Sequence, residues 1–266
     1  MSTLRVGRIA ALNMYPIYHG LENGPRDDLT FEDGVPTQLN DALLRDELDI
    51  SAVSSISYAR NADQLKLLPV ASISANGAVD SIQVFSNVPF QRLRHVAVTP
   101  DSATSVALLR VLVGAEPEPF RTLEGDPASA LEDVDGVMLI GDQALEGLRA
   151  GLGTYRTDLS EVWRARTGLP MVFAVWAARG DVAVARPDEV AALSQRLRSA
   201  RGEYAKDPEL VVVAAAERFP FSVEYIRSYF RRLRFDFGPA ERAGLEHFLQ
   251  LARSAGLLDE VPRLAA

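Results

Sequence analysis

The sequence contains no cysteine among its 266 residues. Disulfide bonds, thiolate metal ligands and cysteine nucleophiles are therefore excluded. Only three histidines are present, and none stands in a spacing typical of a metal site. Glycine-rich phosphate loops of the P-loop or dinucleotide-binding type are missing as well. The sequence thus predicts a site built from hydroxyls, amides, carboxylates and backbone groups, with no metal and no cofactor.

A basic excess and long apolar runs are also absent. The net charge of −8 at pH 7 argues against a general nucleic-acid surface. The longest apolar runs, such as 169–178, fall well short of the roughly 20 residues of a membrane-spanning helix, and the first residues do not resemble a secretory signal. We expect a cytoplasmic protein that binds neither nucleic acid nor membrane. Its oligomeric state is left open.

Strand-like runs alternate with helical ones, which is typical of an α/β fold. The pattern restarts near residue 90, which predicts two lobes around a cleft. Lobe one is expected to combine 1–85 with 177–266, and lobe two to span 86–176. Strands are expected at 4–13, 48–54, 67–74, 78–86, 95–99, 136–140 and 170–178, and late helices at 187–203, 221–233 and 239–255.

Small polar residues follow several of these strands. In open α/β sheets, ligands bind at the carboxyl ends of the strands. Most of these groups are neutral, and the helix starting after Ser102 presents unpaired N–H groups that favour an anion. Simple alternatives stay open: a turn at Asn13, and helix capping by Ser102 or Asp142. The residues at strand ends are Asn13, Ser54, Ser55, Ser81, Ser102, Thr104, Ser105, Gly141 and Asp142.

In series, these motifs resemble the menaquinone-biosynthesis family of the futalosine route, in particular its chorismate dehydratases. Arg8 and Met171 depart from the pattern that we expect in relatives, but neither is an expected contact. The segments that carry the resemblance span almost the whole chain: Arg8 to Pro16, Leu48 to Ala59, Leu68-Pro69 with Gly77 to Ser81, Asp101 to Leu109, Leu139 to Leu145 and Trp163 to Trp176.

The resemblance implies a type 2 periplasmic-binding-protein fold with a central cleft between two lobes. It also implies a carbon–oxygen lyase that removes water from chorismate to give 3-[(1-carboxyvinyl)oxy]benzoate. Asn13 and Ser81 are then expected to act in catalysis. The remaining strand-end residues are expected to bind substrate: Ser54, Ser55, Ser102, Thr104, Ser105, Gly141 and Asp142.

The base that removes the ring proton is not evident from the sequence. We hypothesise that the enolpyruvyl carboxylate of the substrate takes it, with Asp142 as the alternative. Two other functions stay open: a solute-binding protein that captures a small carboxylate, and the sister dihydroxynaphthoate synthase of the same pathway. The residues that flank Asn13 and Ser54 favour the dehydratase.

Overall fold

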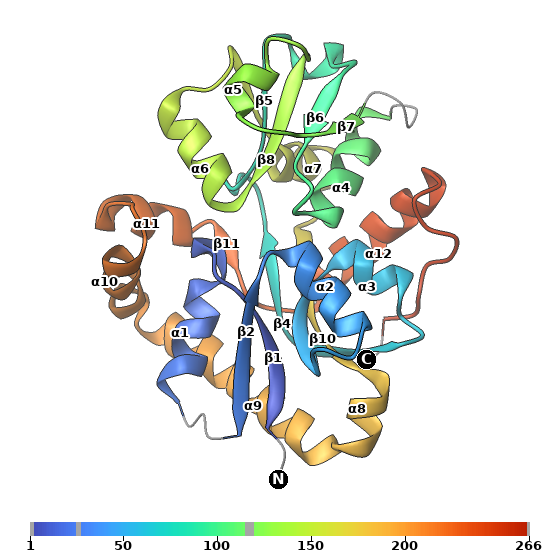
Figure 1. Cartoon of the computed structure of the whole chain (residues 1–266), viewed down its shortest axis with the longest axis vertical. Coiled ribbons are helices and arrows are strands. Elements are labelled where there is room, and N and C mark those ends of the chain that lie inside the picture. The colour runs from blue at the N-terminus through green and yellow to red at the C-terminus, as the bar shows by residue number, and fades with distance from the viewer. Residues whose placement is uncertain (1–2, 25–27, 115–119, 265–266) are drawn as a thin grey trace.

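Two separate β-sheets, each covered by helices, divide the protein into two lobes (Figure 1). The computed structural model describes residues 3–24, 28–114 and 120–264. The first sheet consists, in spatial order, of β11 (Leu233–Arg234), β4 (Leu65–Ala75), β10 (Met171–Arg179), β3 (Ile50–Ser54), β1 (Leu4–Ile9) and β2 (Leu29–Gly34). The second consists of β7 (Phe120–Thr122), β6 (Val96–Val98), β8 (Gly136–Ile140), β5 (Ile82–Ser86) and β9 (Tyr155–Asp158). The predicted α/β class is confirmed.

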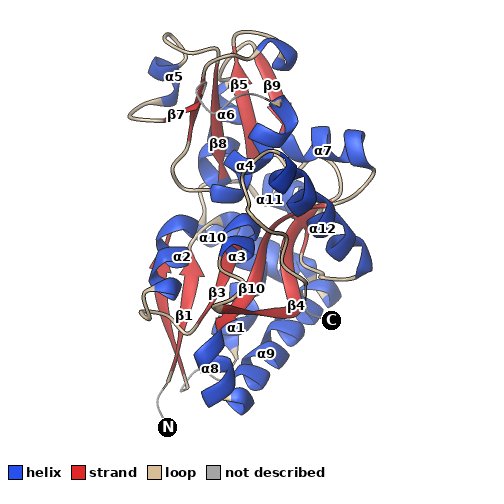
Figure 2. Ribbon diagram, turned by 90° about the vertical axis from the view of Figure 1, so that its right-hand side faces the viewer, coloured by secondary structure: helices blue, strands red, loops and turns tan. Residues whose placement is uncertain are grey.

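The central strands of both sheets are almost entirely buried, because helices cover both faces. This two-sided burial explains why β8 and β10 read as nearly continuous apolar runs. Figure 2 shows the helices and the sheets from the side. β1 pairs in parallel with β2 and β3, whereas β10 runs antiparallel to β3 and β4. The carboxyl ends of β1 and β3 therefore meet at the edge of the sheet that faces the second lobe.

Most helices belong to the first lobe, including all those after residue 179. Its helices are α1 (Tyr15–Asn23), α2 (Pro36–Leu44), α3 (Ser55–Arg60), α8 (Gly180–Ala185), α9 (Pro187–Lys206), α10 (Pro208–Arg218), α11 (Val223–Phe230) and α12 (Pro239–Ser254). The second lobe has α4 (Ala103–Val113), α5 (Pro127–Ala130), α6 (Gly141–Ala150) and α7 (Leu159–Thr167). Two short 3-10 helices, η1 (Leu12–Met14) and η2 (Phe90–Arg92), complete the described elements.

The chain passes between the two sheets twice. β4 ends at Ala75 in the first sheet and β5 begins at Ile82 in the second; α7 ends at Thr167 and β10 begins at Met171 back in the first. The lobe boundaries expected from the sequence, 85/86 and 176/177, fall inside β5 and β10. Both strands pair along their length within a single sheet. We propose that the boundary between the lobes lies instead in the two passages, between Ala75 and Ile82 and between Thr167 and Met171.

The buried carboxylate of Asp158 fixes the first passage to the second lobe. Its Oδ2 accepts hydrogen bonds from the backbone N–H groups of Val79 and Asp80, at 2.8 and 2.7 Å, and from the Gln83 amide at 2.8 Å. Its Oδ1 accepts from two N–H groups that begin α7, at 2.9 and 3.1 Å. Residues 79–80 therefore belong to the second lobe.

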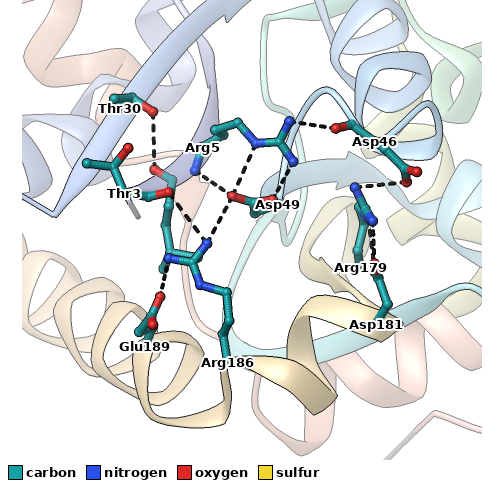
Figure 3. A network of polar contacts seen from close by, with 10 residues as sticks. Thr3, Arg5, Thr30, Asp46, Asp49, Arg179, Asp181, Arg186 and Glu189 are labelled. Carbon is teal, nitrogen blue, oxygen red and sulfur yellow. Dashed lines mark hydrogen bonds and ion pairs between the residues drawn. The ribbon is translucent and has the colours of Figure 1, made fainter. Parts of the chain in front are cut away.

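A separate polar network lies at the opposite end of the first lobe (Figure 3). Asp49 is 4% exposed, and its carboxylate accepts hydrogen bonds from the backbone N–H and guanidinium of Arg5, at 2.8 and 2.6 Å. The guanidinium of Arg186 lies 3.6 Å away. Burial opposes ionisation of Asp49, but the bonds from Arg5 outweigh it, so its pKa lies below the usual range. The network joins β1 to the start of α9.

Candidate functional site

The two lobes touch through hydrogen bonds at the carboxyl ends of β1 and β3. The backbone N–H of Leu12, in η1, donates to Oδ1 of Asp142 on α6 at 3.2 Å. The backbone N–H of Ile56, in α3, donates to Oγ1 of Thr104 on α4 at 3.2 Å. Strand ends of the first lobe thus face helix starts of the second, which is the arrangement in which α/β proteins bind ligands.

A cavity of about 400 Å³ opens between the lobes beside the Leu12–Asp142 contact. The first lobe contributes 9–11, 33–36 and Gln38, and the second contributes Asp101 and 140–143. Its volume suits a small organic ligand. The cavity therefore forms the predicted cleft between the lobes, and it includes Gly141 and Asp142 from the expected set.

Asn13 lies in η1, between the end of β1 and the start of α1. Its side-chain Oδ1 is buried and has no hydrogen-bond partner among the described residues. Buried polar atoms are almost always paired, so this acceptor is available for a ligand donor. The neighbouring residue, Leu12, makes the contact with Asp142.

Ser54 ends β3 and Ser55 begins α3, but both hydroxyls are engaged inside the first lobe. The Asn40 amide donates to Ser54 Oγ at 2.6 Å, and Ser54 Oγ lies 3.2 Å from the hydroxyl of Ser57. Ser55 donates to the carbonyl of Val172 at 2.7 Å. The hydrogen bonds of these two serines hold the start of α3 against α2 and β10.

Ser102 caps α4, which is the simple alternative that the sequence left open. Its Oγ accepts from the backbone N–H of Ser105 at 3.2 Å and donates to the Ser105 hydroxyl at 2.9 Å. The hydroxyl of Thr104, the residue before Ser105, accepts a hydrogen bond from the backbone N–H of Ile56 across the lobe junction. The three hydroxyls of this helix start lie together and are at least nine-tenths buried.

Ser81, Gly141 and Asp142 are brought together at the start of α6. The backbone N–H of Gly141 donates to the carbonyl of Ser81 at 2.8 Å, and Gly141 has a φ of +54°, which favours glycine. Burial raises the pKa of Asp142; the N–H of Leu12 opposes this shift and the charge of Glu146 adds to it. A carboxyl with a raised pKa in a cleft is typical of functional sites.

Tyr229 on α11 joins this group, although the sequence gave no sign of it. Its side chain is 1% exposed. Burial raises the pKa of its hydroxyl, a hydrogen bond with the Ser81 side chain lowers it, and the charge of Asp142 raises it further. The phenol therefore lies beside Ser81. The sequence pattern predicted only buried aromatics in this helix, and a contact with a residue of the other lobe leaves no trace in such a pattern.

The described residues contain no group of three or more His, Asp or Glu side chains placed to hold a metal ion. In the same part of the chain, no helix is both long enough and apolar enough to cross a membrane.

The two-lobed architecture defines a protein of the periplasmic-binding-protein fold. A Candida albicans protein, described as having the generic form of that fold, superposes with a TM-score of 0.71 over 98% of this chain and 92% of that one, at 14% identity. At the level of sequence, the chain belongs to the menaquinone-biosynthesis family, whose sequence model matches residues 4–254.

Two curated relatives carry the name chorismate dehydratase. The protein from Thermus thermophilus is 34% identical over 256 residues, which cover 90% of this chain and 91% of the relative. The protein from Campylobacter jejuni is 32% identical over 173 residues, which cover 63% of this chain and 64% of the relative. Similarity to the first relative thus extends over both lobes.

Proposed function

We propose that this protein removes water from chorismate to give 3-[(1-carboxyvinyl)oxy]benzoate, as a carbon–oxygen lyase of menaquinone biosynthesis. The family match and the names of both curated relatives support this proposal. The structural observation that carries it is the unpartnered Oδ1 of Asn13, buried beside the contact between Leu12 and Asp142. The biosynthetic names also support a cytoplasmic location.

The proposed reaction breaks two bonds on neighbouring ring carbons. One carbon bears the enolpyruvyl ether and loses its hydrogen as a proton; the next loses its hydroxyl with the electron pair of the C–O bond. A new C=C bond completes the aromatic ring, and the proton and hydroxide leave as water. Because aromatisation drives the reaction, the protein mainly has to orient the substrate and stabilise the departing oxygen.

Asn13 matches one feature of this substrate. With both carboxylates ionised, the ring hydroxyl is the only hydrogen-bond donor that chorismate carries, and Oδ1 of an asparagine is an acceptor. We therefore assign the ring hydroxyl to Asn13, with Ser81 as the second catalytic residue beside it.

The remaining proposed residues fall into two groups, according to the hydrogen bonds that they make within the protein. Ser102 and Ser105 form the start of α4, where N–H groups favour a carboxylate, and Gly141 and Asp142 line the cavity. Ser54, Ser55 and Thr104 hold α3 in place against its neighbours. We propose that these three act on substrate binding by positioning the wall of the site.

The proton acceptor that we propose is the enolpyruvyl carboxylate of the substrate itself. The residues that line the cavity include carboxylates but neither histidine nor lysine. Asp142 is the alternative acceptor, because it lines the cavity and is held by Leu12.

Incubation of the protein with chorismate, followed by ultraviolet absorbance, tests the proposed reaction. An aromatic product that forms at a rate proportional to protein concentration is the expected result. Absence of product at saturating chorismate would reject the lyase. Tight binding of chorismate without turnover would instead indicate a solute-binding protein, which the same fold permits.

A further inference from the structure

A second cavity, of about 370 Å³, lies between the lobes on the side where α4 meets α3 and α12 (Figure 1). The first lobe contributes Thr37, Arg60 and Leu257 to its wall, and the second contributes residues of β6, α4 and β7. Ser102, which the sequence predicted to bind substrate, lines this cavity and not the one beside Asp142. A ligand held here therefore contacts both lobes at once.

The charge of this second cavity is opposite to that of the whole protein. The protein has a net charge of −8, yet the described residues that line the cavity include three arginines and no carboxylate. One of the three, Arg121, has a partner outside the cavity wall, because its guanidinium lies 3.8 Å from the carboxylate of Asp133. The other two, Arg60 and Arg110, form no ion pair with a described residue, so the cavity attracts an anion.

Arg110 carries a buried donor without an acceptor. Its Nε is buried and has no hydrogen-bond partner among the described residues. Its Cζ lies 5.4 Å from the centroid of the Phe120 ring, which also lines the cavity. Such a cation–π contact stabilises the charge, but the ring offers no oxygen or nitrogen that could accept from the N–H. Since buried polar groups almost always have a partner, this donor indicates a ligand that supplies the acceptor.

Arg60, the last residue of α3, presents its guanidinium from the first lobe. Its Nε and Nη2 donate to the carbonyl of Leu257, at 3.4 and 3.2 Å, and Leu257 lines the cavity. One turn earlier on α3, the backbone N–H of Ile56 donates to Thr104 of α4. Arg110 lies further along α4. The two guanidiniums therefore belong to the two helices that this contact joins across the lobe junction.

We propose that the second cavity is a binding site for a small oxyanion, a carboxylate or a phosphate, held between Arg60 of the first lobe and Arg110 of the second. The planar fork of a guanidinium matches both kinds of anion. Because the donors come from both lobes, the bound anion stabilises the closed arrangement. The two cavities adjoin, since Asp101 lines one and Ser102 the other, so the anion is either a carboxylate of the substrate or a separate ion.

Titration of the full-length protein with inorganic phosphate, at constant ionic strength in chloride, tests the site. Isothermal titration calorimetry should show saturable binding to the wild type. Arg60→Gln and Arg110→Gln should each weaken the affinity for phosphate by about tenfold or more, because each removes a charged hydrogen-bond donor. The matched control is Arg198→Gln, which makes the same change of charge at an exposed position on α9, outside the cavity. This control should bind phosphate as the wild type does.

Two results would overturn the proposed anion site. One is the absence of saturable phosphate binding to the wild type. The other is an equal affinity for phosphate in the wild type and in both the Arg60→Gln and Arg110→Gln variants. Neither measurement uses turnover, so the site is tested independently of the proposed reaction. A wild type that binds phosphate through these arginines but does not convert chorismate rejects the reaction and leaves the anion site standing.

Kinetics with chorismate and added phosphate identify the source of the anion. Phosphate that competes with chorismate, together with a raised KM in the Arg110→Gln variant, indicates that a carboxylate of the substrate occupies the site. Phosphate that binds through the same arginines without competing indicates a separate anion.

Discussion

Oδ1 of Asp142 accepts a hydrogen bond from the backbone N–H of Leu12 at 3.2 Å, across the junction between the lobes. The donor belongs to the short 3-10 helix that also carries Asn13, and the acceptor begins the helix that follows β8. One bond thus joins two of the strand-end segments that the sequence analysis singled out, those of Asn13 and Asp142. The cleft is closed at this point, while a cavity stays open beside it.

Replacement of Asn13 by alanine should lower activity far more than stability. Because Oδ1 has no partner among the described residues, its removal breaks no bond within that part of the protein. We expect kcat/KM for chorismate to fall by about 10²-fold, with a change in the free energy of unfolding of about 0.5 kcal/mol or less. Steady-state kinetics and thermal melting check both values.

The matched control for this experiment is Asn40→Ala. The Asn40 side chain is 4% exposed and bonds both Ser54 and Ser57, so its loss should cost about 1–3 kcal/mol of stability. If the Asn13→Ala variant were as active as the wild type, the proposed role of Asn13 would be wrong and Asn13 would be an ordinary turn residue.

Asp142→Asn distinguishes the two candidates for the proton acceptor. Asparagine keeps an acceptor for the Leu12 N–H, so the lobe contact is retained. If the substrate carboxylate takes the proton, kcat should stay within about tenfold of the wild type. A much steeper loss with unchanged chorismate binding would assign the proton to Asp142 instead. Asp142→Ala, which leaves the Leu12 N–H unpaired, should cost about 1–3 kcal/mol of stability.

The stability of the Asp142→Asn variant should differ from that of the wild type in a pH-dependent way. Burial raises the pKa of Asp142 in the folded state, so ionisation destabilises the fold as pH rises above the unfolded value of ~3.9. Asp142→Asn should therefore melt at the same temperature as the wild type at low pH and at a higher one at neutral pH. Melting curves across pH 3 to 8 would contradict this if the order were reversed.

Thr104→Val should weaken substrate binding more than turnover. Valine has nearly the same shape but leaves the N–H of Ile56 without its acceptor across the lobe junction. The unpaired N–H penalises the closed arrangement by about 1–3 kcal/mol, which raises KM by roughly 5- to 150-fold if closure accompanies binding. Thr104→Ser retains the hydroxyl and should keep KM near the wild-type value. Equal KM values for the two variants would argue against this contact.

Asp49 should govern acid stability without affecting activity. Its pKa is lowered in the folded state, despite the opposing effect of burial, by the bonds from Arg5. Its stabilising contribution is complete above the unfolded pKa of ~3.9 and is lost as pH falls through the lower folded value. The Asp49→Asn variant should therefore melt at a lower temperature than the wild type at pH 7. Below pH 4 the difference in melting temperature should become smaller. A difference that stays constant across this range would exclude the charge of Asp49 as the cause.

Much of the fold was predictable from local patterns. Buried strands such as β8 and β10 are apolar runs, and prolines mark the first turns of α2, α9 and α12. The helices and strands that the sequence did not reveal are β2, β7, β9, β11, α1, α5, α8 and α10. The four strands lie at sheet edges and are short or carry polar side chains, so they lack the apolar pattern of a central strand.

The sequence predicts where the candidate site lies better than it predicts the side-chain hydrogen bonds within it. Of the residues expected at strand ends, Gly141 and Asp142 line the cavity between the lobes, as ligand-binding residues of open α/β sheets do. The side-chain bonds of Ser54 and Ser55 depend on Asn40 and Val172, which are distant in sequence. The contact between Tyr229 and Ser81 likewise joins residues that are distant in sequence.

The bonds to Asp158 have a consequence for how the lobes move. Since residues 79–80 are held by that carboxylate, the first passage between the sheets is reduced to residues 76–78. The second is residues 168–170. Each segment contains a glycine at positive φ, Gly77 at +129° and Gly168 at +71°. The two short segments lie side by side, because Ala75 and Met171 pair in the first sheet. Backbone torsions there would turn the two lobes about a single axis as rigid bodies.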